Sequence, residues 1–200
     1  MSVILAGGLA SPWRAEHDGY VSGTSYATAP DGQVLTTAAV AAADTLYGYL
    51  WFNPAPVTVS ALLARCATGG AGSAMKAAVW RYANRRAQGV PVLAFNTGVA
   101  TTATADLTMT VSGVLPAGWL LLASKFTGTL PSMAMVPAGQ RTARLHGGTV
   151  SNAVQISNAV TLSASDAYAN DIAATDLSAV TLTLIASATA LPPHIGFTVA

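Results

Sequence analysis

Alternation of apolar and polar residues recurs along the chain after residue 45. In the runs 57–63, 107–112 and 180–184, apolar residues stand mainly at every second position, with Thr or Ser between them. A period of two residues is typical of a β-strand with one buried and one wet face. Five further apolar runs, each bounded by Gly, Pro, Asn or Ser, cover 74–82, 90–95, 119–125, 154–163 and 195–199. The pattern predicts about eight strands.

No amphipathic helix of ordinary length interrupts these runs, so units of strand, helix and parallel strand are disfavoured. Short strands separated by turn residues are typical of antiparallel sandwiches and barrels. We therefore expect an all-β domain over residues 46–200, built as an antiparallel two-sheet sandwich of jelly-roll type.

Residues 1–45 differ from the rest because Gly and Pro punctuate them at positions 12, 19, 23, 30 and 32. Such spacing leaves no room for long regular elements. We expect an extended N-terminal arm here. The Ala-rich piece Thr36–Ala43 is too short for a stable helix without packing, and a docked turn or strand is an equal alternative.

Charge is scarce: 8% of the residues are charged and 52% are hydrophobic, whereas soluble domains average about 25% charged residues. A surface with so little repulsive charge tends to associate, so we expect a subunit of an oligomer. The net charge of +1 gives no basic patch for a nucleic acid. The single Cys66 allows no intrachain disulfide or cysteine-based zinc site and is expected to be a small buried residue.

Targeting and membrane segments are not expected. The apolar start of the chain carries no basic region and is broken by Gly7 and Gly8, unlike a signal peptide. The most apolar later stretch, 114–123, contains Pro116 and is shorter than the roughly 18 residues of a spanning helix.

One motif suggests an enzyme. The segment Ser22–Ala27 looks like the region around the nucleophilic serine of subtilisin-type proteases, with Ser25 in the place of the nucleophile. That chemistry also needs a His base oriented by an Asp, and only the adjacent pair His17 and Asp18 precedes the serine. A turn rich in Gly, Ser and Thr is the preferred interpretation, and we expect no catalytic residue.

Three other groups of residues are candidate ligand sites. Gly69, Gly70, Gly72 and Lys76 lack the Gly-Lys-Ser/Thr order of a phosphate loop, so we expect a turn between two strands.

His17, His146 and His194 lack the spacing of metal ligands. An acidic loop could offer oxygen ligands to calcium, but its spacing matches no known calcium loop, and a solvated loop is preferred; its residues are Asp166, Asn170, Asp171 and Asp176. We expect no metal and no cofactor.

A cluster of aromatic and basic residues is a candidate for ligand binding. Trp80, Tyr82, Arg85 and Arg86 combine rings with positive charge, a composition that binds sugars or anionic polymers through stacking and cation–π contacts. In a strand, alternate residues point to opposite faces, so core packing followed by a charged turn is preferred. In a carbohydrate-binding module, the alternative function, Trp80, Tyr82, Trp119 or Tyr168 would stack on sugar rings.

The stretch from about residue 46 to 135 resembles sandwich domains of tail-fibre, spike and head-appendage proteins of tailed bacteriophages. The similar segments are LYGYLWF (46–52) before PVTV (56–59), AVWRYAN (78–84) before GVP (89–91), and LPAGWL (115–120). The resemblance ends near Pro137 and therefore implies nothing about a receptor pocket beyond it.

This resemblance implies a structural virion protein, and the expected lack of a signal peptide and of disulfides suits a part made in the host cytoplasm. Such proteins are commonly trimers that contact other virion proteins, and some bind a glycan on the host surface. We therefore expect a fibre, spike or capsid-decorating subunit without membrane insertion. A carbohydrate-binding module is the alternative, and a serine hydrolase that uses Ser25 is a remote third.

Overall fold

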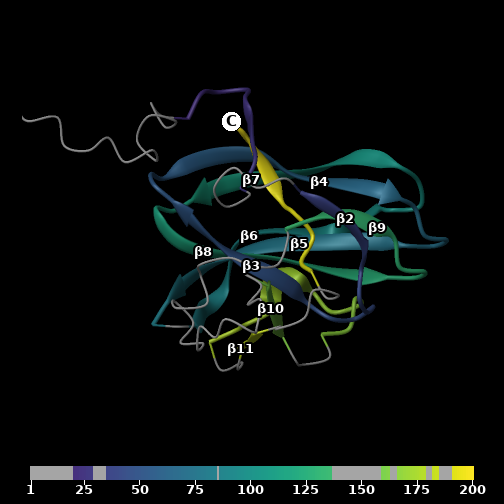
Figure 1. Ribbon diagram of the computed structural model, residues 1–200. Helices are drawn as coiled ribbons and strands as arrows, with labels where there is room; N and C mark the ends of the chain where they lie inside the picture. Colours follow the sequence, from purple (N-terminus) through teal and green to yellow (C-terminus); the bar gives the residue numbers. More distant parts are fainter. Residues whose placement is uncertain are drawn as a thin grey trace, which may run out of the picture.

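The computed structural model describes residues 20–28, 35–84, 86–136, 159–162, 166–178, 182–184 and 191–200. These residues form twelve strands and one short 3-10 helix, η1 (Ile172–Ala174), and every strand pairing is antiparallel. The predicted all-β sandwich of two antiparallel sheets is confirmed (Figure 1).

The first sheet has the order β1-β12-β4-β9-β2, and β7 pairs with the long strand β4. The second sheet has the order β11-β10-β3-β8-β5-β6. The first sheet comprises β1 (Ser25–Tyr26), β2 (Thr36–Ala39), β4 (Val57–Thr68), β7 (Ala105–Leu115), β9 (Ser132–Met135) and β12 (Gly196–Val199). The second comprises β3 (Tyr47–Asn53), β5 (Ala74–Ala83), β6 (Arg86–Ala100), β8 (Gly118–Thr127), β10 (Ala159–Leu162) and β11 (Leu182–Leu184).

The two-residue period of the sequence places the main core between the sheets. In β7, the buried residues Leu107, Met109 and Leu115 alternate with exposed Thr and Ser. Tyr47 and Tyr49 of β3 reach the same core from the other sheet. Cys66 is fully buried here, as predicted for a small apolar residue.

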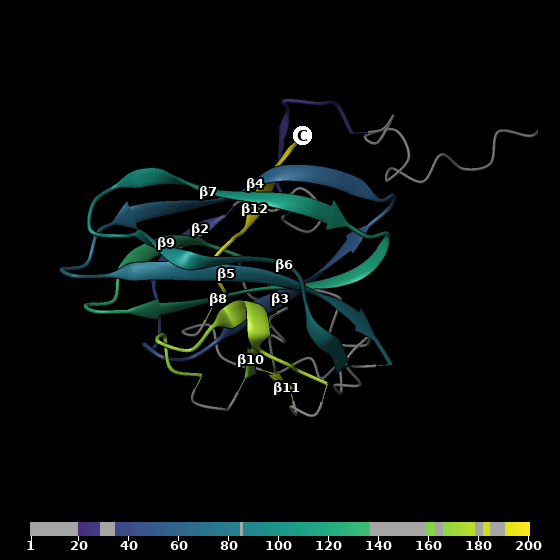
Figure 2. The same cartoon turned by 180° about the vertical axis from the view of Figure 1, so that it is seen from behind.

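A second apolar cluster lies on the outer side of the second sheet. It joins residues of β3, β5 and β8 to Ile172 and Leu177 of the segment 166–178. Figures 1 and 2 show η1 beneath the second sheet, on the side away from the first sheet. Because this segment covers the outer face, β5 and β8 are buried almost throughout rather than alternately.

The region predicted as an arm contributes two strands to the first sheet. β1 pairs with β12, and β2 pairs with β9. The piece Thr36–Ala43 therefore begins as a strand, one of its two predicted alternatives. The domain boundary at residue 45 stays a prediction, although both strands before it are hydrogen-bonded to the sandwich. Within the described parts of the chain, no helix is long and apolar enough to cross a membrane.

Candidate functional site

Ser25 lies at the exposed edge of the first sheet, and its side-chain hydrogen-bond partner among the described residues is a threonine. Its Oγ is 3.0 Å from Oγ1 of Thr198 on β12. His17 and Asp18, the partners considered from sequence, lie outside the described residues. The described histidine, His194, accepts a hydrogen bond at Nε2 from the backbone N–H of Thr28 at 3.2 Å. The described geometry around Ser25 is a side-chain pair across two strands, which has no nucleophilic chemistry of its own.

The aromatic members of the candidate ligand-binding cluster are interior residues. Trp80 is fully buried and Tyr82 is 7% exposed, and the indole Nε1–H of Trp80 donates to the carbonyl of Thr175 at 3.1 Å. Neither ring presents a face on which a sugar could stack. Arg86 is exposed at the start of β6, and Arg85 lies outside the described residues. The core interpretation therefore holds for Trp80 and Tyr82.

A different aromatic pair is accessible, and the sequence reasoning recognised only half of it. Phe52 on β3 is opposite Trp119 on β8, and their ring centroids are 5.3 Å apart in an edge-to-face arrangement. Phe52 is 46% exposed, and Trp119 is half-buried against the outer cluster. The two residues are far apart in sequence and become neighbours only through the pairing of β3 with β8. The sequence does not show that pairing, so Phe52 was not predicted.

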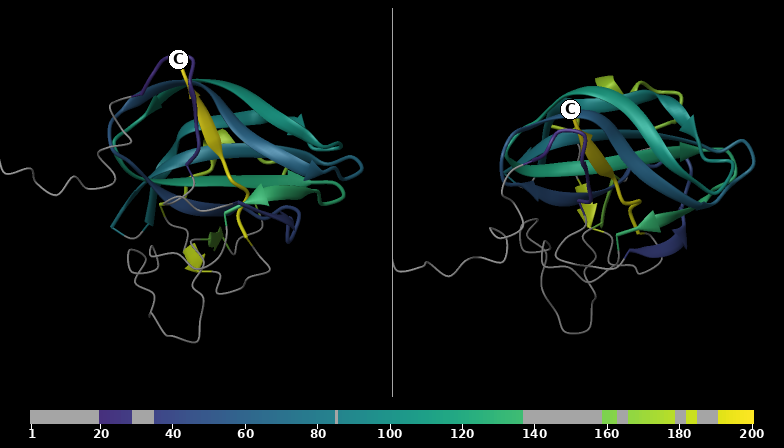
Figure 3. Two further views of the ribbon diagram at one scale, coloured as in Figure 1. Left: turned by 45° about the horizontal axis from the view of Figure 1, so that its top comes forward. Right: turned by 90° about the horizontal axis from the view of Figure 1, so that it is seen from above.

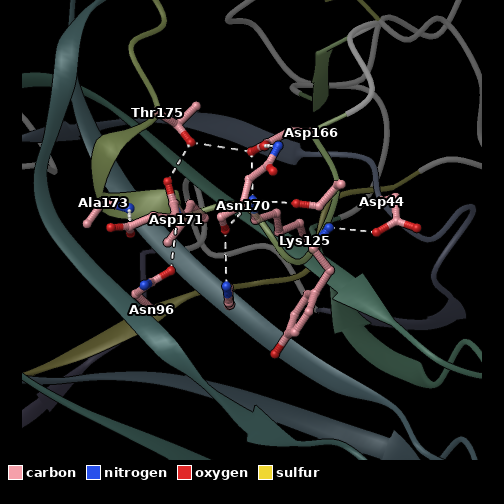
Figure 4. Close-up of polar contacts among 12 residues, drawn as sticks. Asp44, Asn96, Lys125, Asp166, Asn170, Asp171, Ala173 and Thr175 are labelled. Carbon is pink, nitrogen blue, oxygen red and sulfur yellow. Dashed lines mark hydrogen bonds and ion pairs between the residues drawn. The ribbon is translucent and has the colours of Figure 1, made fainter.

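The acidic loop 166–176 accepts hydrogen bonds from two lysines of the second sheet. Lys125, a fully buried residue of β8, donates to Oδ2 of Asp166 at 2.8 Å and to the carbonyls of Ala167 and Asn170 at 3.1 and 3.2 Å (Figure 4). These three acceptors satisfy the three N–H donors of an ammonium group. The contact fastens the segment 166–178 to the second sheet.

Lys76 forms the second half of this attachment. It is opposite Lys125 on the neighbouring strand β5, and its Nζ donates to the same carbonyl, that of Asn170, at 3.1 Å. The ammonium also lies 4.8 Å from the centre of the Tyr168 ring, within the range of a cation–π contact. Burial lowers the pKa of Lys76, and the nearby charge of Lys125 lowers it further.

The segment 166–178 has its own internal supports. Asp171 caps η1 by accepting a hydrogen bond from the backbone N–H of Ala173, and Asp166 accepts one from the amide of Asn170 at 3.0 Å. The backbone N–H of Tyr168 donates to Asp44 at 2.6 Å. Among the described residues, no group of three His, Cys, Asp or Glu side chains is placed to hold a metal.

The glycine-rich stretch is a turn between β4 and β5, as predicted. A Cβ at Gly69 would lie 2.1 Å from the backbone of Thr102, and one at Gly70 would lie 1.9 Å from the carbonyl oxygen of Thr129. Only glycine at these two positions lets this turn approach the backbone at Thr102 and at Thr129 so closely. Lys76 points to the covering segment described above, so it has no role in this turn.

A buried polar cluster attaches Thr28 of segment 20–28 to Tyr49 of β3 and to Ile195, the residue before β12. The hydroxyl of Tyr49 accepts from the N–H of Ile195 at 3.0 Å and donates to its carbonyl at 2.9 Å. Oγ1 of Thr28 contacts the Tyr49 hydroxyl and donates to the same carbonyl of Ile195. Burial raises the pKa of Tyr49. Burial also lowers the pKa of His194 to about 4, so the ring is neutral and its Nε2 accepts from Thr28.

A cavity of about 620 Å³ opens at the end of the sandwich near this segment. The described residues of its lining have uncharged side chains; they are Tyr20, Ser22, Pro54, Ala55, Pro56, Val57, Thr58, Val199 and Ala200. Burial raises the pKa of Tyr20 to about 12, and the neighbouring Tyr26 adds to the effect. The phenol is therefore a neutral hydrogen-bonding group near neutral pH.

Among the described residues, no segment covers the outer face of the first sheet, and most side chains of β4 and β7 on this side are exposed or half-buried. We call it the open face; the accessible side chains that form it are Ser25, Thr58, Ser60, Leu63, Arg65, Asp106, Thr108, Thr110, Ser112, Val114 and Thr198, and Ala61 is buried among them. Figure 3, in the view from above, shows β4 and β7 uncovered. Its two charges neutralise each other, because Arg65 lies 2.6 Å from Asp106. The rest is small, uncharged or apolar, unlike the covered outer face of the second sheet.

No protein-family model matches the chain, and no curated protein matches it. Function is therefore inferred from the geometry of the described residues.

Proposed function

We propose that this protein is a structural subunit of a larger assembly, of the kind that forms the surface of a tailed bacteriophage particle as a fibre, spike or capsid-decorating protein. The observation that carries the proposal is the open face: a broad sheet surface on which the two charges already pair with each other. Burying such a surface against another protein leaves no charge without a partner.

The low conformational entropy of this face supports the same proposal. Ser, Thr, Ala and Val dominate it, and short or β-branched side chains lose little rotamer freedom when they are buried. Lys and Glu, which resist association, do not occur among its residues. The resemblance of residues 46–135 to phage appendage domains suggests the particle, a trimeric state, other virion proteins as partners and a virion location.

The neighbourhood of the gene tests the phage part of the proposal. Genes for capsid, portal or tail proteins on both sides would support a virion subunit. A position beside secreted polysaccharide-degrading enzymes would contradict it and would favour a sugar-binding module. This comparison is independent of the surface that the subunit uses, so it separates the identity of the assembly from the location of its contacts.

Carbohydrate binding is the second candidate, and the Phe52–Trp119 pair is the observation that favours it. Accessible rings on a rigid sheet provide an apolar platform for the C–H face of a sugar. A glycan array tests this candidate: binding that is lost in Trp119→Ala, and kept in an exposed threonine variant such as Thr129→Ala, would support it. Absence of binding across the array would exclude it for the glycans tested.

A further inference from the structure

We infer that acid detaches the chain segment 20–28 from the sandwich while the two sheets stay folded, and that protonation of His194 is the step that detaches it. Such a release is independent of the assembly that the chain joins, so it goes beyond the proposed function. Three features of the molecule support it: the hydrogen bonds of His194, the small number of contacts that hold the segment, and the positions of the groups that titrate in acid.

Thr28, the last residue of the segment, is held by a ring nitrogen that must carry no proton. Its backbone N–H donates to Nε2 of His194 at 3.2 Å, and the backbone N–H of His194 is fixed to the carbonyl of Ala134 at 2.9 Å. A protonated imidazole has an N–H donor at both ring nitrogens, so Nε2–H would face the N–H of Thr28, donor against donor. Because Thr28 is fully buried, its N–H would lose this acceptor without gaining a water molecule. Protonation of His194 therefore breaks the attachment.

Besides the hydroxyl contacts of Thr28 described above, a short strand and two rings hold the segment. Its strand β1 has two residues, paired with β12, and residues 21–25 are exposed. Tyr20 and Tyr26 pack against Phe197, with ring centroids 5.6 and 5.7 Å away. The central strand β8, by contrast, pairs with β3 on one edge and with β5 on the other. Segments with few buried contacts open at a lower free energy than core strands, so this segment can detach while the core stays folded.

Within this contact, His194 is the described group that titrates between pH 4 and pH 7. The segment 20–28, β12 and β9 contain no Asp, Glu or His. The titratable group that faces the ring from β3 is Tyr49, which stacks on it at 6.5 Å, and those of the segment are Tyr20 and Tyr26. Phenols stay neutral in acid. The described carboxylates form their hydrogen bonds outside the segment and β12; they are Asp44, Asp106, Asp166, Asp171 and Asp176.

The pKa of His194 determines the size of the effect. Burial lowers this pKa from 6.5 to about 4 while the segment is attached, and detachment returns the ring to water and its pKa toward 6.5. Between these pH values the detached form binds a proton that the attached form does not bind, so acid favours detachment. Linkage of the two equilibria predicts that the equilibrium constant for detachment rises about 30-fold between pH 7.5 and pH 5.

Hydrogen–deuterium exchange of the full chain at pH 7.5 and pH 5 tests the release, with each rate compared with that of an unstructured peptide at the same pH. The amides of Gly23 and Val199 report detachment, because each donates to a carbonyl across the contact between the segment and β12. Their protection is expected to fall about 30-fold at pH 5. The amides of β8 exchange when the whole sandwich unfolds, so they should remain at least about 100-fold better protected at both pH values.

Two variants separate the titration of His194 from the other contacts. His194→Gln keeps an acceptor for the N–H of Thr28 but does not titrate, so the segment should have equal protection at both pH values. Ser25→Ala is the matched control: it removes the hydroxyl contact with Thr198 but leaves His194 in place, so the effect of pH should remain about 30-fold. A wild type without an effect of pH, or an equal effect in His194→Gln, would overturn the role of His194. Equal protection of the segment and β8 would overturn the separate release, because the sandwich would then open only as a whole.

Discussion

Lys125 and Asp166 form an ion pair of 2.8 Å between a fully buried ammonium and a nearly buried carboxylate, 41 residues apart in sequence. The pair joins the central strand β8 to the segment that covers the outer face of the second sheet. Most other contacts of this segment are single hydrogen bonds, so the ion pair is the point at which its attachment is most sensitive to substitution.

Asp166→Asn is expected to destabilise the protein by about 2–4 kcal/mol, because it leaves the Lys125 charge buried without its counter-ion. Lys125→Met is expected to cost less, since methionine buries no charge and Asp166 retains some contact with water. The measurement is the free energy of unfolding in urea.

Asp171→Asn is the matched control for this prediction. It makes the same chemical change in the same segment, and Asn caps a helix as well as Asp does. Its expected effect is within about 0.5 kcal/mol. Equal losses of unfolding free energy in Asp166→Asn and Asp171→Asn would contradict a particular stabilising role of the Lys125–Asp166 ion pair.

His194 should make stability depend on pH in the acid range. Burial lowers its pKa from 6.5 to about 4 in the folded protein, so the unfolded chain binds the proton more readily. The stabilisation is complete above pH 6.5 and is lost as the pH falls to 4, by about 3 kcal/mol in total. Urea unfolding at half-unit pH intervals measures the loss.

His194→Gln removes this titration while keeping an acceptor for the N–H of Thr28. The variant should therefore have a flatter profile than the wild type between pH 6.5 and 4. If both proteins lose stability in parallel over that interval, other acidic groups are responsible and the role assigned to His194 is wrong.

Gly70 and Gly72 should respond very differently to alanine, although they lie in one turn. At Gly70 a Cβ would overlap the carbonyl of Thr129, whereas at Gly72 it would enter open space. Gly72 has a φ of +66°, so Gly72→Ala is expected to cost only the left-handed strain of about 1–2 kcal/mol. Gly70→Ala should cost clearly more, since two backbones must separate. A thermal unfolding series compares them, and similar midpoints would contradict the steric argument.

A fluorophosphonate probe is expected not to label the protein. Ser25 is paired with Thr198, and a serine without a general base is a weak nucleophile. The measurement is intact mass after incubation, with a serine protease treated in parallel as a positive control. Labelling that disappears in Ser25→Ala would show that the serine is activated and would revive the hydrolase alternative.

The sequence alone determined the class of fold, because side chains of a strand alternate between two faces and leave that period in the order of residues. Each of the eight predicted runs overlaps an observed strand. The strands that were not counted among them are β1, β2, β3 and β9. β1, β2 and β9 have four residues or fewer, too few to show a period, while the first part of β3 is buried on both faces and has none.

Only the tertiary structure decided which residues share a surface. Core packing was the preferred interpretation for Trp80, but only the structure shows that the segment 166–178 covers its face, because no local pattern in β5 records that cover. Phe52 contacts Trp119 because β3 pairs with β8. Lys125 contacts Asp166 because the distant segment 166–178 packs on the second sheet. The open face arose in the same way, since alternation predicts that one side of β4 and β7 is wet, whereas the packing of the whole chain determines which wet side stays uncovered.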